Sequence, residues 1–187
     1  MSITNLLVPT FTQMLGALSG WLDKADAQLS VEEAKALPGA RLAPDMFPLS
    51  TQVRFACVQA LEAVHRLRGL DYPPAVAELL GEGRNADAQP GSIADAQARI
   101  AQTMAVLDAL APDALDVDPQ SPIAHALPIG MVFDLTALQY ARDWALGQFY
   151  FHVMTAYAIL RNAGVNIGKA DYIPHMLPFM RQAPAEA

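Results

Sequence analysis

The chain contains four histidines, and a histidine side chain can act as a base or a metal ligand near neutral pH. His152 stands apart, because the segment from Trp144 to Leu160 around it contains no Asp, Glu, Lys or Arg. A neutral imidazole on a buried helix face needs a partner for each ring nitrogen. We therefore expect His152 to be either a core residue hydrogen-bonded to a neighbouring helix, or a general base or metal ligand that faces a cavity.

Polar partners for His152 are spaced by seven residues in an earlier helical segment. Asp45, Gln52 and Gln59 follow one margin of its apolar arc, from which side chains can reach a neighbouring helix. Asp45 has an equally good alternative role as a helix cap. One histidine with one carboxylate and amides is a poor donor set for zinc, which favours three strong ligands and a water.

The remaining reactive residues have simpler expected roles. We expect His65, His125 and His175 to be structural or exposed, and Cys57 to be an inert core residue. Arg161 is expected to stabilise the end of its helix or to pair with a carboxylate. The phosphate-loop, dinucleotide, zinc-protease and nucleophile-elbow motifs do not occur in the sequence.

Composition narrows the class of protein. The chain has 187 residues, is 53% hydrophobic and 17% charged, and carries a formal net charge of -7. Such a chain favours one folded domain over disorder, and its acidic balance argues against binding nucleic acid. The single cysteine cannot form an intramolecular disulfide, and the N-terminal residues lack the pattern of a signal peptide. We expect a cytoplasmic protein with no membrane partner.

Four long amphipathic helices must position these side chains. Apolar spacing and capping residues predict helices over about residues 9–27, 45–69, 92–112 and 135–163, the last of them bent at Gly147. The last helix is apolar almost all round, so we expect it to be the most buried. An all-α four-helix bundle follows, with any site formed by side chains of facing helices.

Shorter segments connect these helices. Ser30 and Glu33 form a capping-box pattern, which predicts a short helix. Residues 70–91 are expected to be a loop insertion with one helical turn near residues 75–80, because prolines and glycines interrupt them. Two apolar runs around a Pro-Gly turn predict a small β-hairpin within residues 117–134. We expect one domain over residues 1–172 and a C-terminal tail over residues 173–187.

Two blocks of sequence are similar to a known family. The first is ARLAPDMFPL, residues 40–49, and the second is FYFHVMTAYAILR, residues 149–161, with the segment that follows it to Asp171. Over roughly residues 5–172 the chain resembles the domain of unknown function 1993 family, which is related to the DinB/YfiT-like proteins. That resemblance implies a four-helix bundle, often dimeric, in which some members bind a divalent metal through three histidines.

The chain departs from the three-histidine pattern. The DinB pattern has one histidine on the second helix and a pair spaced by four on the last helix, but here Ala156 follows His152, and His65 faces away from the apolar arc. The resemblance implies a pocket between the second and fourth long helices, without specifying a reaction.

Two hypotheses result. In the first, this pocket binds a small ligand, with or without a divalent metal. His152 and Asp45 are then the candidate catalytic residues, His152 is also the candidate metal ligand, and Arg41, Gln52 and Tyr157 are candidate ligand-binding residues. In the second, the protein is a non-enzymatic homodimer in which the apolar last helix supplies the interface and His152 is a structural core residue.

Overall fold

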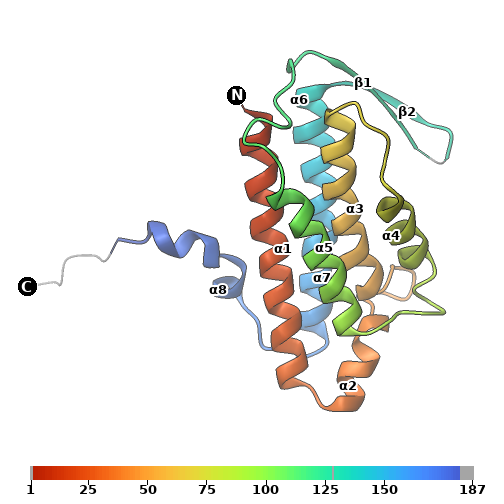
Figure 1. Cartoon of the computed structure of the whole chain (residues 1–187). Coiled ribbons are helices and arrows are strands. Elements are labelled where there is room, and N and C mark those ends of the chain that lie inside the picture. The colour runs from red at the N-terminus through yellow and green to blue at the C-terminus, as the bar shows by residue number, and fades with distance from the viewer. Residues whose placement is uncertain (1, 128, 182–187) are drawn as a thin grey trace, which may run out of the picture.

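Four long helices form the body of the computed structural model, which describes residues 2–127 and 129–181. They are α1 (Ile3–Gln28), α3 (Leu49–Leu67), α5 (Ile93–Asp108) and α7 (Leu146–Asn162). Both α1 and α3 pack against α5 on one side and α7 on the other (Figure 1). The predicted mostly helical bundle is therefore confirmed. Residues 182–187 of the expected tail lie outside the described residues.

The shorter elements connect the bundle helices or lie against them. They are α2 (Val31–Ala36), η1 (Leu37–Gly39), α4 (Pro74–Arg84), β1 (Pro122–Ala126), β2 (Val132–Thr136), α6 (Ala137–Gln139), the π-helical segment η2 (Tyr140–Ala145), α8 (Lys169–Tyr172) and η3 (Pro174–Phe179). The predicted capping box of α2 is present, because Glu33 N–H donates to Ser30 Oγ and Ser30 N–H donates to the Glu33 carboxylate. No described helix is long and apolar enough to span a bilayer.

The first helix begins six residues earlier than the sequence pattern predicts. Ser2 caps it by accepting from Asn5 N–H at 3.0 Å, and the side chains of Ile3 and Leu7 are fully buried. Pro9 therefore lies inside the helix, although the pattern places it at the start. The burial of these two side chains, together with the cap, offsets the backbone hydrogen bond that proline cannot make.

Residues 70–91 differ most from expectation, because they contain the eleven-residue helix α4 instead of a single turn. Tertiary contacts that local sequence does not reveal hold this helix against α3. Thr51 Oγ1 donates to the Gly83 carbonyl at 2.7 Å, and Gly83 packs directly on the Phe55 ring. Figure 1 shows α4 outside the four-helix body, beside α3.

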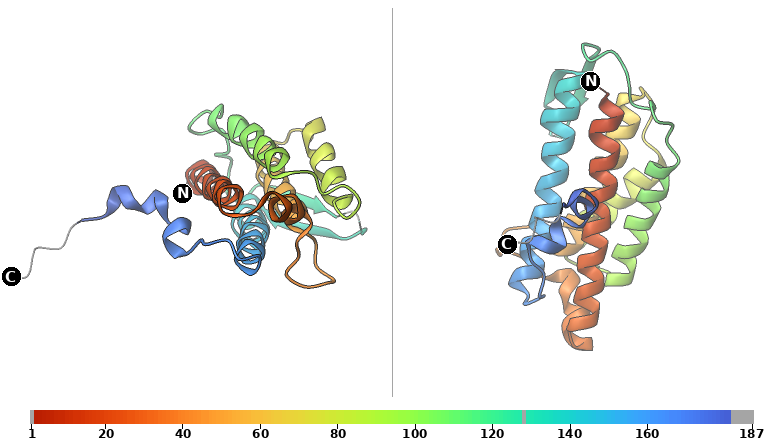
Figure 2. Two further views of the ribbon diagram at one scale, coloured as in Figure 1. Left: turned by 90° about the horizontal axis from the view of Figure 1, so that it is seen from below. Right: turned by 90° about the vertical axis from the view of Figure 1, so that its left-hand side faces the viewer.

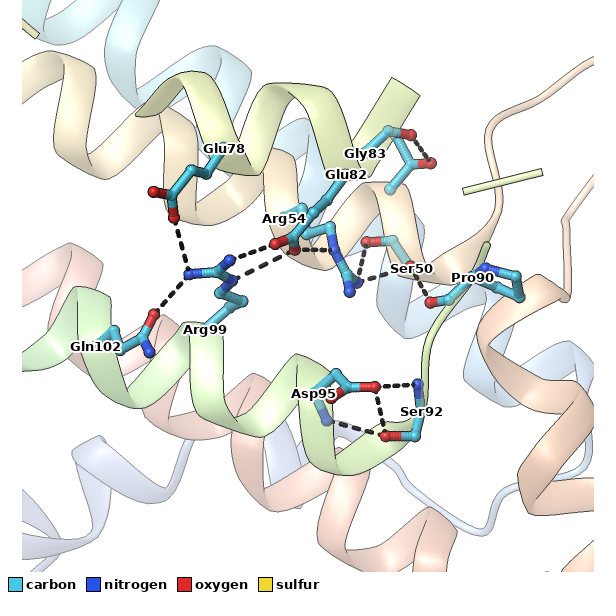
Figure 3. Close-up of polar contacts among 11 residues, drawn as sticks. Ser50, Arg54, Glu78, Glu82, Gly83, Pro90, Ser92, Asp95, Arg99 and Gln102 are labelled. Atoms are coloured by element: carbon cyan, nitrogen blue, oxygen red, sulfur yellow. Dashed lines mark hydrogen bonds and ion pairs between the residues drawn. The ribbon is translucent and has the colours of Figure 1, made fainter. Parts of the chain in front are cut away.

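A buried arginine joins three helices and the loop before α5. Arg54 is 4% exposed; its Nε donates to Glu82 at 2.8 Å and its Nη1 donates to Ser50 Oγ at 2.7 Å (Figure 3). Arg99 on α5 pairs with the same Glu82 carboxylate, and Ser50 Oγ donates to the Pro90 carbonyl. Burial acts to raise the pKa of Glu82, but hydrogen bonds from Arg99 and Arg54 outweigh it and lower the pKa.

The hairpin and the last long helix form one continuous unit. Strands β1 and β2 are antiparallel, with Ile123 opposite Leu135, which confirms the predicted hairpin. Ile123 and His125 both point to the buried side. The chain then continues through α6 and the π-helical segment η2 into α7, while the bend at Gly147 stays a prediction. Figure 1 shows the hairpin at the end of the bundle where α6 begins.

The C-terminal segment leaves the bundle beside α1. Asp171 fixes α8, because its carboxylate pairs with Lys24 and its carbonyl accepts from Trp21 Nε1 at 2.9 Å. Beyond this point η3 extends away from the four helices, as Figure 1 and the left view of Figure 2 show. The expected tail therefore contains a short helical segment, with Met176 and Phe179 exposed.

The contact between α4 and Phe55 leads to a prediction at two glycines of one helix. A Cβ atom at Gly83 would lie 2.5 Å from the Phe55 ring, whereas one at Gly81 would meet nothing within 4 Å. We expect Gly83→Ala to lower the free energy of unfolding by about 1–3 kcal/mol through overpacking. Gly81→Ala should raise it by up to about 1 kcal/mol, because alanine favours helix. Urea denaturation measures both, and equal effects of the two substitutions would contradict the contact.

Candidate functional site

A hydrogen bond between α3 and α7 brings together two of the predicted site residues. His152 Nδ1 lies 2.9 Å from Gln52 Oε1, and both side chains are buried. Gln52 Nε2 donates to the Phe47 carbonyl at 3.2 Å, and a carbonyl can only accept. This contact sets the orientation of the amide, so Gln52 Oε1 must accept from a protonated Nδ1. The lone pair of His152 is consequently on Nε2.

Aromatic rings enclose the His152 imidazole on two sides. The ring centroids of Phe55 and Phe151 lie 5.4 Å and 5.3 Å from that of His152, both in edge-to-face arrangement. Burial among them disfavours the charged form and lowers the pKa of His152 to about 4. The imidazole is therefore neutral at physiological pH, with an acceptor nitrogen held in a fixed direction.

His152 lies on the wall of a cavity of about 490 Å³. The cavity is bounded by α3, α4, the hairpin and the start of the last long helical unit. Four aromatic rings form much of its apolar wall, from Phe47, Phe55, Tyr72 and Trp144. A mostly apolar cleft of this size with a few polar groups is typical of a site for a small organic molecule.

The other end of the cavity carries polar groups. Glu62 on α3 is partly buried, and burial raises the pKa of its carboxyl despite the nearby charges of Arg66 and Arg84. The Tyr72 hydroxyl accepts from Arg66 at 2.7 Å. Gln59 also lines this wall. One helix face of α3 thus supplies Gln52 near His152 and two further polar side chains along the cavity.

The structure places the other candidate residues away from this cavity. Asp45 is exposed, in a turn closed by the bond from Met46 N–H to the Ala43 carbonyl. Arg41 pairs with Asp87 and donates to the Met46 carbonyl at 2.8 Å, so it fastens the loop that precedes α3.

Two more polar candidates on α7 also lie elsewhere. Tyr157 packs edge-to-face on Trp21 at 5.1 Å and borders a separate apolar hollow of about 280 Å³. Arg161 donates to the Ile167 carbonyl at 2.7 Å, which matches its expected structural role. Cys57 is fully buried, and burial raises its pKa to about 11, as expected of an inert core thiol.

Several cavity residues were not among the predicted site residues. They are Glu62, Tyr72, Arg84, His125 and Trp144. For His125 a signal existed, because alternation along the predicted strand puts it on the same side as Ile123, which is the buried side. The others come from segments that are distant in sequence or were expected to be loop, so only folding brings them together.

The donor set does not match a three-histidine metal site. Within residues 2–127 and 129–181, no group of three His, Cys, Asp or Glu side chains is placed to hold a metal ion. His65, the single histidine of α3, bonds through Nδ1 to the Leu61 carbonyl at 2.8 Å on its own helix. His152 therefore lacks the two companion ligands of the DinB pattern, and we derive no chemical step through a metal.

Comparison with known proteins shows the family of this chain. The model for the family described as Domain of unknown function (DUF1993) matches residues 3–173. The chain belongs to this family. Its structure is similar to the crystal structure of a DinB family member protein from Shewanella denitrificans, with a TM-score of 0.72 and 30% identity over 98% of this chain and 94% of that one. No curated protein matches the chain.

The depressed pKa of His152 predicts how stability varies with pH. The folded protein binds a proton at His152 more weakly than the unfolded chain does, so stability is complete above about pH 6.5 and falls as pH decreases toward 4. Across that window we expect His152 to account for a loss of about 3 kcal/mol. Urea unfolding of the wild type and His152→Leu at several pH values measures the difference.

His65→Gln is the matched control for this measurement, because it removes a histidine from the outer side of α3. It should retain the pH dependence of the wild type, whereas His152→Leu should flatten it. Identical pH profiles for wild type and His152→Leu would contradict the assigned burial effect.

Proposed function

We propose that this DUF1993 family protein binds a small, uncharged organic molecule in the cavity that α3, α4 and the hairpin form beside His152. The observation that carries the proposal is the Gln52–His152 hydrogen bond, which fixes the protonated nitrogen and leaves Nε2 as an acceptor on the cavity wall. A hydroxyl or N–H group of the ligand would donate to Nε2, while the aromatic rings enclose its apolar part.

The low pKa defines what His152 can contribute. An imidazole with a pKa of about 4 is a weak base at neutral pH, since efficient general bases have pKa values near the working pH. His152 is well suited to accept a hydrogen bond and poorly suited to remove a proton by itself. The proposal is accordingly one of ligand recognition, and Asp45 has no part in it because it lies outside the cavity.

Phenol and toluene form a matched pair of probes for this site. We expect phenol to bind more tightly than toluene, because only phenol can donate to Nε2, and to move the His152 Nε2 resonance in nitrogen-15 NMR. The preference should disappear in His152→Leu. His65 provides an internal control resonance. Saturating phenol that leaves the His152 resonances unmoved would refute the site.

A second candidate function is self-association through α7. On the outer side of this helix Phe151 is 57% exposed and Met154 is 39% exposed, next to the small residues Gly147 and Ala158. Large exposed apolar side chains on one helix face are typical of a protein interface. We therefore propose a homodimer in which this face packs on a second copy.

Sedimentation at micromolar concentration tests the dimer. The wild type should sediment as a dimer, and Phe151→Glu should shift it to monomer, because a charge would be buried at the interface. Val31 is 81% exposed on α2, so Val31→Glu is the matched control and should leave the mass unchanged. A monomeric wild type would exclude this interface.

A further inference from the structure

Two polar side chains on the wall of the same cavity have no hydrogen-bond partner among the residues that the structure describes. His125 on β1 is 3% exposed, and neither of its ring nitrogens is bonded. The indole Nε1–H of Trp144 on η2 is also buried without a partner. The two rings lie 4.4 Å apart between centroids, so the three unpaired nitrogens gather in one place.

Such groups are costly to bury. An unsatisfied buried donor or acceptor costs about 1–3 kcal/mol, and native proteins retain few of them. Burial, reinforced by the charge of Arg66, lowers the pKa of His125, so its ring is neutral and carries one N–H donor and one acceptor. An apolar residue in place of His125 would avoid this loss of stability. A polar residue that is present in spite of the loss is typical of a binding site.

The position of the pair indicates what it could bind. Both side chains line the cavity that His152 borders, and the torsion that turns an imidazole ring has broad minima. A small rotation would therefore present an N–H to a molecule in the cavity. Trp144 can only donate, so the ligand must supply an acceptor there. Glu62 and Arg84 line the same wall with side chains of opposite charge, so the wall does not select an anion, and a neutral carbonyl oxygen is enough to satisfy the donors.

We propose that His125 and Trp144 form a second recognition point of this cavity, which binds the carbonyl oxygen of an uncharged aromatic ligand. We infer an aromatic ligand because the rings of Phe47, Phe55 and Tyr72 also line this cavity. The inference rests on the proposed function, because the same ligand donates to His152 Nε2 at its other end.

Two probes of nearly equal shape test the carbonyl. 4-Hydroxyacetophenone carries a carbonyl oxygen that 4-ethylphenol lacks, while both carry a phenol for His152. By calorimetry we expect the wild type to bind the ketone roughly tenfold more tightly, the equivalent of one hydrogen bond to a buried donor. In His125→Leu this ratio should fall severalfold. An unchanged ratio in His125→Leu would overturn the proposal.

The indole N–H proton resonance of Trp144 reports on this contact directly, because the chain has two tryptophans and the Trp21 indole N–H already donates to the Asp171 carbonyl. The Trp144 indole proton should shift downfield with 4-hydroxyacetophenone and much less with 4-ethylphenol. The Trp21 indole proton is the internal control and should remain in place with both probes. Equal Trp144 shifts with the two probes would count against the carbonyl contact.

Stability without any ligand gives an independent measurement. His125→Leu should raise the melting temperature by about 2–4 °C, since it removes unpaired polar atoms. His152→Leu is the matched control and should lower it, because it leaves the Gln52 Oε1 atom unpaired. A lower melting temperature for His125→Leu would show a structural role and overturn the inference.

The failure of this inference can be distinguished from failure of the proposed function. If both phenols bind equally and move the His152 resonance, the cavity binds ligands through His152 and only the His125–Trp144 assignment is wrong. If neither phenol binds, the proposed function and the inference that rests on it both fail.

Discussion

The buried charge of Arg54 is the constraint on which the cavity depends. A guanidinium that is 4% exposed must be paired, and the partner comes from Glu82 on α4, with Arg99 of α5 on the same carboxylate (Figure 3). The pairing keeps α4 against α3, reinforced by the Thr51 hydroxyl and by the absence of a side chain at Gly83. With α4 in that position, Phe55 is held against His152, and Leu80 and Arg84 complete the wall of the cavity.

One helix therefore performs two tasks on neighbouring faces. On α3, Ser50 and Arg54 fasten the outer helix and the loop before α5, while Gln52 and Phe55 turn toward α7 and position the His152 ring. The first set is a closed network whose hydrogen bonds are made within the protein. The second set ends at His152, whose Nε2 makes no hydrogen bond to the described residues, on the cavity wall that His152 shares with His125 and Trp144. Polar groups left without hydrogen bonds beside a cavity lower the stability of the fold. Ligand-binding sites commonly carry such a cost.

The described residues do not supply the three-histidine donor set of the DinB pattern. The fold is shared with a DinB family member at 30% identity, yet the described residues contain no cluster of three potential ligands. Here a glutamine amide holds the imidazole, and aromatic rings surround it. A fold of this kind can support different sites, so function must be argued from the residues that line the cavity.

The sequence by itself determined the mostly helical bundle, the hairpin, the cap at Ser30 and the burial of His152, because apolar periodicity and capping are local signals. It also identified Gln52 as a candidate partner of His152, since seven-residue spacing places side chains on one face. Only the tertiary structure decided that α4 is a helix, that Asp45 and Tyr157 lie away from the cavity, and that His125 and Trp144 join His152 on its wall. Those outcomes depend on contacts between segments far apart in the chain, where a buried charge or a close glycine contact outweighs local propensity.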